Sequence, residues 1–153
     1  MSTNPLLTGL LQEKHLVLNL RVAGKAALLA DMARRAAAAT DIPDASLRAA
    51  LTAREALGST GFGAGIAVPH ARIAGLAAPF ALFARLDRPI PFDAIDGQPV
   101  DLVFLLLSPS AADGTHLALL AAISRRLRDK AVARSLRTAR CPAEALEVIV
   151  REG

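Results

Sequence analysis

Apolar residues recur along the chain with two different spacings, which separate helical from extended segments. In residues 24–40 they return every three or four positions, which predicts an amphipathic helix packed on a sheet. Residues 45–57 follow the same period, with Leu47 and Leu51 on the buried stripe. Residues 15–20 instead alternate between apolar and other positions, which predicts an early strand. The side chains expected on one side of that strand are Leu16, Leu18 and Leu20.

Three further apolar runs have the length of strands. Residues 66–68 form a short one that ends at Pro69, which lacks the N–H needed for ladder pairing. Residues 80–86 and 100–107 are longer. The second is too continuous for a sheet face open to water, so we expect a central strand there. Asp96-Gly97 is a turn dipeptide between them, and it predicts that the flanking segments approach as a hairpin.

The remaining periodic segments predict helices at both ends of the chain. A short helix is expected in 5–11, and a last one begins at Pro142, since proline suits the first helical position. A long helix is expected to begin near Thr115. The side chains expected to point inward from it are Leu117, Leu120, Ile123 and Leu127. Four or five strands interleaved with about five helices indicate an α/β fold, and the length of 153 residues favours a single domain over 1–153.

The candidate chemistry is concentrated between the helix of 45–57 and the strand of 66–68. Its glycines allow positive φ and a close approach of the backbone to a ligand. These are Gly58, Gly61, Gly63 and Gly65. Exposed N–H groups in such a loop, with the Ser59 and Thr60 hydroxyls beside them, suit an anion, most naturally a phosphoryl group. His70 follows Pro69 at the predicted strand end. A histidine there can serve as a general base or as a nucleophile toward phosphorus, and the chain offers no triad for the first role.

Arg54 lies on the same helical side as Leu47 and Leu51, which directs it toward the core and toward the glycine-rich loop one turn away. An arginine aimed inward needs an anion. It can pair with a carboxylate in the fold or fork onto phosphoryl oxygens, and the residues alone leave both roles open.

Other motif assignments fail on the residues present. The stretch 61–65 lacks the spacing of a dinucleotide fingerprint and the Gly-Lys-Ser/Thr ending of a P-loop. His70 and His116 have no third ligand at metal spacing, so we expect no metal. Cys141 is the single cysteine, cannot form an intramolecular disulfide, and is expected to be structural.

Composition narrows the range of partners. A net charge of +4 would permit nucleic-acid binding, but aromatic residues are 3% of the chain, with no Trp or Tyr for base stacking. A partner with an acidic docking face fits this charge as well. No apolar run approaches a membrane span and the first residues lack a basic signal region, so we expect a cytoplasmic protein.

At these residues the chain resembles a known family. The run 54–70 is similar to the signature of enzyme IIA proteins of the bacterial phosphotransferase system, in the fructose/mannitol/nitrogen-regulatory class. The sequence of residues 57–61 most resembles the nitrogen-regulatory branch. The stretches 92–100 and His116-Leu117, with the helix that follows, also resemble the family.

The resemblance implies a mixed sheet flanked by helices and a phosphoryl group carried on Nε2 of His70. The donor would be a histidine phosphocarrier protein, without ATP, Mg²⁺ or another cofactor. His116 matches a second family histidine that hydrogen-bonds the site. Arg54 and the loop residues would then stabilise the phosphoryl charge. The loop residues expected to do so are Ser59, Thr60 and Gly61.

Two functions fit this chemistry. One is a regulatory protein whose phosphorylation state changes its cytoplasmic targets, such as potassium-transport or sensor proteins. The other is a sugar-specific transferase that feeds an enzyme IIB of a fructose or mannitol permease. The sequence of residues 57–61 and the absence of a fused IIB or IIC segment favour the regulatory protein.

Overall fold

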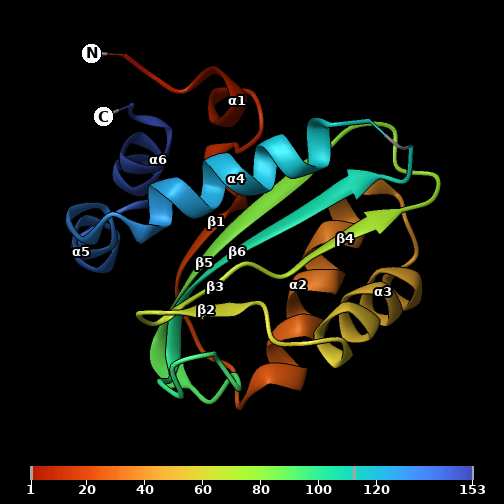
Figure 1. Cartoon of the computed structure of the whole chain (residues 1–153), viewed down its shortest axis with the longest axis horizontal. Helices are drawn as coiled ribbons and strands as arrows, with labels where there is room; N and C mark the ends of the chain where they lie inside the picture. Colours follow the sequence, from red (N-terminus) through yellow and green to blue (C-terminus); the bar gives the residue numbers. More distant parts are fainter. Residues whose placement is uncertain (1, 112, 153) are drawn as a thin grey trace.

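The computed structural model describes residues 2–111 and 113–152. The elements in chain order are α1 (Pro5–Thr8), a 3-10 turn (Glu13–His15), β1 (Leu16–Leu20), α2 (Lys25–Thr40), α3 (Asp44–Ala56), β2 (Gly61–Gly63), β3 (Ile66–Ala67), β4 (His70–Ile73), β5 (Phe80–Ile90), β6 (Val100–Pro109), α4 (Thr115–Arg128), α5 (Lys130–Thr138) and α6 (Pro142–Val150). Helices α2 and α3 lie on one side of the sheet, and α1, α4, α5 and α6 lie on the other (Figure 1). The predicted α/β class, a mixed sheet flanked by helices, is confirmed.

Strand β6 is the central strand of a six-stranded sheet with the order β1-β5-β6-β3-β2. It runs antiparallel to β5, with Ile90 opposite Val100, so the predicted hairpin is confirmed. On its other side it pairs in parallel with β3 at 102–103 and with β4 at 106–109. Strands β3 and β4 are therefore two parts of one interrupted strand, separated by residues 68–69.

Successive side chains of β6 enter two different cores, one on each face of the sheet. Those that pack with the α1/α4/α5/α6 layer are Leu102, Phe104 and Leu106. Those that pack with α2 and α3 are Val103, Leu105 and Leu107. This burial on both faces is the reason why residues 102–107 are all apolar.

Strand β1 does not keep the predicted alternation. Asn19 has a φ of 59°, and the pairing with β5 shifts between Val17 and Leu20. Leu16 and Leu18 contact the α4 side of the sheet, whereas Leu20 contacts the α2 side. The prediction that all three leucines share a side is wrong, because an irregular residue in the strand moves the next side chain to the other face.

Helix α4 begins at Thr115 as predicted, but its buried face differs from the prediction in the first turn. Leu117 is 65% exposed, so the prediction that it points inward is wrong. The residues on the buried stripe are His116, Leu119, Ile123 and Leu127. His116 itself occupies the first position of this stripe, at the spacing i, i+3, i+7 and i+11. Ile123 and Leu127 are buried as predicted, and Leu120 is partly buried against the same core.

Helix α5 and strands β2 and β4 have no counterpart among the predicted elements. Asp129 caps α5, since its carboxylate accepts from the N–H groups of Ala131 and Val132 at 2.9 and 3.3 Å. Cys141 is exposed and precedes α6, whose first residue is Pro142 as predicted. Within 2–111 and 113–152, no helix is long and apolar enough to cross a membrane.

Candidate functional site

His70 is the first residue of β4, directly after the break at Pro69. Its Nδ1 atom lies 2.8 Å from the carbonyl oxygen of Val68. A carbonyl oxygen can only accept a hydrogen bond, so the ring carries its proton on Nδ1 and its lone pair on Nε2. Val68 lies between β3 and β4, so its carbonyl is free to turn toward the ring. The sequence predicted His70 at a strand end, and the structure places it at the start of the next strand.

Burial lowers the pKa of His70 below its ordinary value of 6.5. The hydrogen bond to the Val68 carbonyl raises that pKa, Arg54 lowers it through its charge, and the Glu55 carboxylate raises it, but burial dominates. The ring is therefore neutral at pH 7. A neutral ring with the lone pair on Nε2 is the form that can attack an electrophile.

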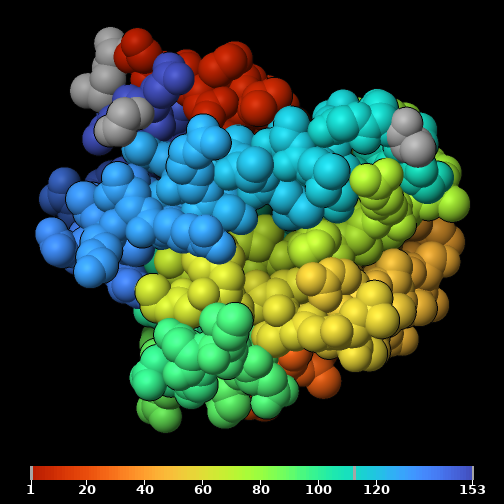
Figure 2. Space-filling model, viewed as in Figure 1, coloured from red at the N-terminus to blue at the C-terminus, as the bar shows by residue number. Residues whose placement is uncertain are grey.

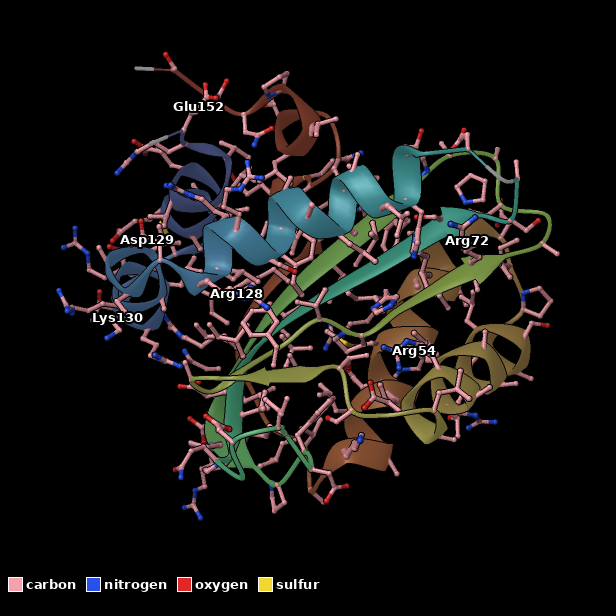
Figure 3. All side chains as sticks on the ribbon, in the orientation of Figure 1. Arg54, Arg72, Arg128, Asp129, Lys130 and Glu152 are labelled. Atoms are coloured by element: carbon pink, nitrogen blue, oxygen red, sulfur yellow. The ribbon has the colours of Figure 1, made fainter. Side chains whose placement is uncertain are left out.

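Arg54 comes from the last turn of α3 and points toward the sheet, the inward direction that the helical spacing predicted (Figure 3). Its Nε atom lies 3.3 Å from Nε2 of His70, and its Nη1 atom donates to the Gly58 carbonyl at 2.8 Å. The Nε–H points at the unprotonated nitrogen of the ring. The guanidinium of Arg54 is therefore in hydrogen-bond contact with the candidate nucleophile, His70.

A buried ion pair fixes the helix end from which Arg54 projects, and the sequence analysis missed it. The Glu55 side chain is 6% exposed and lies 2.7 Å from Nζ of Lys25. The same carboxylate accepts from the Thr60 N–H at 3.2 Å and from the Thr60 hydroxyl. Lys25 also donates to the Phe92 carbonyl at 3.2 Å. These bonds tie α2, α3 and the glycine-rich loop together.

The loop residues predicted to bind phosphate all have internal partners. Ser59 donates its hydroxyl to the Phe92 carbonyl at 2.8 Å and accepts from the Gly61 N–H at 3.0 Å. Both the hydroxyl and the N–H of Thr60 donate to Glu55. A direct contact with phosphate requires these bonds to be exchanged. The phosphate-binding role of Ser59, Thr60 and Gly61 stays a prediction.

Two glycines of the loop serve close packing in the fold. A Cβ on Gly61 would lie 2.9 Å from the Cβ of Ala94. Gly65 has a φ of 80° and follows Ala64 at 57° in the turn between β2 and β3, so both residues adopt the left-handed conformation that a tight hairpin requires. A Cβ there would meet Nη2 of Arg137 at 2.5 Å and the Asp101 carboxylate at 2.9 Å. Close packing at both positions, and the positive φ of Gly65, therefore explain these two glycines without a ligand.

His116, in the first turn of α4, is 7% exposed, and its ring lies beside that of His70. The two ring centroids are 5.6 Å apart, with an angle of 49° between the planes. Nδ1 of His116 lies 2.6 Å from Oγ of Ser108 on β6. The structure therefore brings together all three residues predicted as catalytic, Arg54, His70 and His116. Ser108 and the Val68 carbonyl, which hold the two rings, were missed.

Two arginines place positive charge near this pair of rings, Arg54 beside His70 and Arg72 near His116. Burial lowers the pKa of His116 most; the nearby His70 lowers it further because two protonated rings repel each other, and the charge of Arg72 lowers it as well. Arg72 is exposed and lies two residues after His70 on β4, so both side chains emerge on one face of the strand. Both imidazoles are held neutral in a cationic environment, which suits an incoming dianion.

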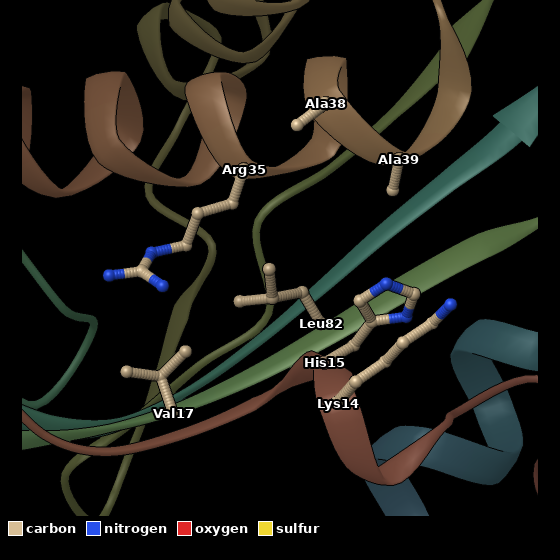
Figure 4. Close-up of a pocket in the computed structure, with 7 residues that line it drawn as sticks. All are labelled: Lys14, His15, Val17, Arg35, Ala38, Ala39 and Leu82. Atoms are coloured by element: carbon tan, nitrogen blue, oxygen red, sulfur yellow. The ribbon is translucent and has the colours of Figure 1, made fainter.

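The third histidine lies elsewhere. His15 is half-buried and packs edge-on against Phe80, with ring centroids 4.8 Å apart. It lines a cavity of about 360 Å³ between α2 and the start of β1, which contains neither His70 nor His116 (Figure 4). The other lining residues are Lys14, Val17, Arg35, Ala38, Ala39 and Leu82. Across the described part of the chain, no group of three or more His, Cys, Asp or Glu residues is placed to hold a metal ion.

Comparison with known proteins identifies the family of the chain. Residues 9–152 match the family described as "Phosphoenolpyruvate-dependent sugar phosphotransferase system, EIIA 2". A nitrogen regulatory protein of Bradyrhizobium diazoefficiens is 45% identical to the chain over 134 residues, which is 88% of each protein.

Solved structures agree with this match. Nitrogen regulatory protein IIA-Ntr from Neisseria meningitidis superposes with a TM-score of 0.91 at 35% identity and covers 95% of this chain and 99% of that one. Enzyme IIAMTL of Escherichia coli, in its complex with phosphorylated enzyme IIBMTL, gives a TM-score of 0.76 at 18% identity, over 91% of this chain and 96% of that one. The second likeness shows a shared fold alone.

Proposed function

The chain belongs to the EIIA 2 family of the phosphoenolpyruvate-dependent sugar phosphotransferase system, and we propose that it accepts a phosphoryl group on Nε2 of His70 from a histidine phosphocarrier protein. The observation that carries this proposal is the contact between His70 Nδ1 and the Val68 carbonyl, at 2.8 Å. It leaves the lone pair on Nε2, the nitrogen that Arg54 faces.

The transfer needs no proton movement at the attacking atom. Nε2 of His70 forms a bond to phosphorus with its lone pair, while the N–P bond of the donor breaks and its electron pair returns to the donor histidine. As Nε2 becomes bonded, positive charge develops on the His70 ring. The hydrogen bond from Nδ1–H to the Val68 carbonyl stabilises that charge.

Arg54 supplies charge stabilisation. In the unphosphorylated protein its Nε–H faces Nε2 of His70, so the guanidinium already lies beside the atom that becomes bonded to phosphorus. A small shift moves this donor from the nitrogen to a phosphoryl oxygen. Because phosphoryl transfer demands mainly positioning and neutralisation of oxygen charge, one preplaced guanidinium is an effective catalyst.

His116 supplies a second donor to the same group. Its ring lies beside that of His70, and its pKa is lowered, so it remains a neutral hydrogen-bonding partner. A neutral imidazole can donate one hydrogen bond to a phosphoryl oxygen without accepting the phosphorus itself. We therefore assign His116 a role as helper and His70 the role of carrier.

Exposed apolar side chains near the site supply a surface on which a partner protein can dock. Leu57 at the end of α3, Ile95 in the β5–β6 loop and Leu117 beside His116 are 85%, 86% and 65% exposed. Figure 2 shows the yellow segment that contains Leu57 and the loop after it at the surface, between α4 and the green β5–β6 loop. Large exposed apolar side chains around a polar site are typical of protein interaction surfaces. Arg72 adds a positive charge for an acidic partner face.

The phosphorylated state would then control cytoplasmic regulatory targets, such as potassium-transport or sensor proteins. This choice is supported by the relatives at 45% and 52% identity, which are named as nitrogen regulatory proteins. The alternative is transfer to an enzyme IIB of a fructose or mannitol permease. This alternative is supported by the fold likeness to enzyme IIAMTL, whose solved complex contains a phosphorylated enzyme IIBMTL.

The test is incubation with phosphoenolpyruvate, enzyme I and a phosphocarrier protein, followed by intact mass measurement. We expect one acid-labile, hydroxylamine-sensitive phosphoryl group, which His70→Ala abolishes. His15→Ala, at the histidine of the distant cavity, is the matched control and should label fully. Undiminished labelling of the His70→Ala protein would reject the assignment. Addition of a purified enzyme IIB separates the two functions, since rapid loss of the label to it favours the sugar-specific alternative.

A further inference from the structure

Ser108 is a buried serine whose hydroxyl contacts the helper histidine. It lies on β6, is 2% exposed, and pairs across the ladder with Arg72 of β4. Its Oγ atom is 2.6 Å from Nδ1 of His116, which is the one side-chain hydrogen bond that Ser108 makes within the described residues. A second cavity, of about 200 Å³, borders both residues.

Two arrangements of protons fit this contact. In the first, Nδ1–H of His116 donates to the serine oxygen, so that Nε2 carries the lone pair. In the second, the serine hydroxyl donates to Nδ1, so that Nε2 carries the proton. The two arrangements differ in what His116 presents to His70.

Hydrogen-bond satisfaction favours the second arrangement. In the first, the hydroxyl proton of the buried Ser108 has no acceptor within the described residues, and an unsatisfied buried donor costs about 1–3 kcal/mol. In the second, the serine proton is used and the imidazole N–H remains free to donate.

We propose that Ser108 is a positioning residue that donates its hydroxyl proton to Nδ1 of His116 and thereby keeps the ring proton of His116 on Nε2. The two rings of the site are then held in opposite forms. The Val68 carbonyl keeps the proton of His70 on Nδ1 and leaves Nε2 free to attack. Ser108 keeps the proton of His116 on Nε2, where it can donate to a phosphoryl oxygen. This last step rests on the proposed function, whereas the proton position does not.

Long-range ¹H–¹⁵N NMR of the unphosphorylated protein tests the proton position directly. We expect His116 with a protonated Nε2 and an unprotonated Nδ1 whose nitrogen shift shows an accepted hydrogen bond. In Ser108→Ala that shift should move toward the value of a free imidazole lone pair, and Ser108→Thr, which keeps the hydroxyl, should restore it. Ser124→Ala, at a half-buried serine of α4, is the control and should leave the shift unchanged. A proton on Nδ1 of His116 in the wild type overturns the proposal.

Transfer rates test whether Ser108 acts through His116. Ser108→Ala should slow phosphorylation of His70 by roughly five- to thirtyfold, the factor that corresponds to one or two kcal/mol. In a His116→Ala background the same change should have no further effect, because the ring it positions is gone. An equal loss in both backgrounds overturns the positioning role. If His70 accepts no phosphoryl group, the proposed function fails, while the NMR result still decides the proton position.

Discussion

Arg54 donates from Nε to Nε2 of His70 at 3.3 Å, and this is the same nitrogen that the Val68 carbonyl leaves unprotonated. The guanidinium therefore covers the lone pair of the candidate nucleophile in the unphosphorylated protein. Phosphorus can reach the ring only if Arg54 releases it, and the released donor is then beside the phosphoryl oxygens. On the proposed function, we therefore expect the geometry of the Arg54 guanidinium to matter more than its charge.

Arg54→Lys should slow phosphorylation by roughly tenfold or more, because an ammonium cannot hold the Gly58 carbonyl and a phosphoryl oxygen with the fixed fork of a guanidinium. The thermal unfolding midpoint should change little. Rapid-quench measurement of transfer from the phosphocarrier, beside calorimetry, gives both quantities. Arg48→Lys, at an exposed arginine of the same helix, is the control. A large loss of stability with an unchanged rate would make Arg54 a structural residue.

Ser59→Ala separates a scaffold role of the glycine-rich loop from direct phosphate binding. Removal of the hydroxyl takes a donor from the Phe92 carbonyl and an acceptor from the Gly61 N–H, so stability should fall by about 1–3 kcal/mol. The transfer rate of Ser59→Ala should fall less than the transfer rate of Arg54→Lys does. Urea unfolding and the transfer assay measure the two effects. The opposite pattern, with full stability and a severe loss of rate, would place Ser59 on the phosphoryl group.

His116→Ala should slow transfer or shorten the lifetime of phospho-His70 without removal of the modification. His116→Gln retains a donor and should recover part of the rate if hydrogen bonding is the role of the residue. Peptide mapping under alkaline conditions locates the phosphoryl group, and hydrolysis kinetics give its lifetime. Phosphate found on His116 in the wild type would contradict the helper role, as would an alanine variant that matches the wild type in both rate and lifetime.

The transfer rate should remain high as the pH falls through 6.5, the ordinary pKa of histidine, since burial lowers the pKa of both His70 and His116. An unfolded chain takes up these protons at a higher pH than the folded chain does. Stability is therefore greatest above pH 6.5 and declines as the pH falls toward the lowered folded pKa values. NMR titration of the ring protons and unfolding at a series of pH values check both statements. Midpoints above 6.5 for either ring would contradict them.

The sequence predicted the parts of the site that depend on local periodicity. Arg54 shares a helical side with Leu47 and Leu51, so its inward direction followed from spacing alone. The resemblance to the enzyme IIA family supplied His116. The partners that hold these side chains could not be predicted, because Lys25 reaches Glu55 and Ser108 reaches His116 only through tertiary packing. Nothing in the sequence around Ser108, at the end of an apolar strand, indicates that its hydroxyl contacts the His116 ring.

The fold was predictable to the same extent and for the same reason. Burial on both faces made 100–107 identifiable as a central strand, since its composition records the two cores around it. The residues 70–73 contain only one alternation on each side and a charged residue, so β4 resembled a loop in the sequence. Asn19 inverted the faces of β1 without a turn signal nearby. Short strands and single irregular residues are set by the sheet as a whole.

The interruption between β3 and β4 changes which mutations can inactivate the protein. The group that fixes the proton of His70 is a main-chain oxygen at position 68, and every amino acid supplies that oxygen. No replacement of the Val68 side chain removes it. Pro69 has no N–H to give to the ladder, and its carbonyl accepts from the Leu106 N–H at 3.0 Å. The sensitive feature is the path of the main chain through 68–69, which turns the Val68 carbonyl toward the ring while every named side chain stays in place.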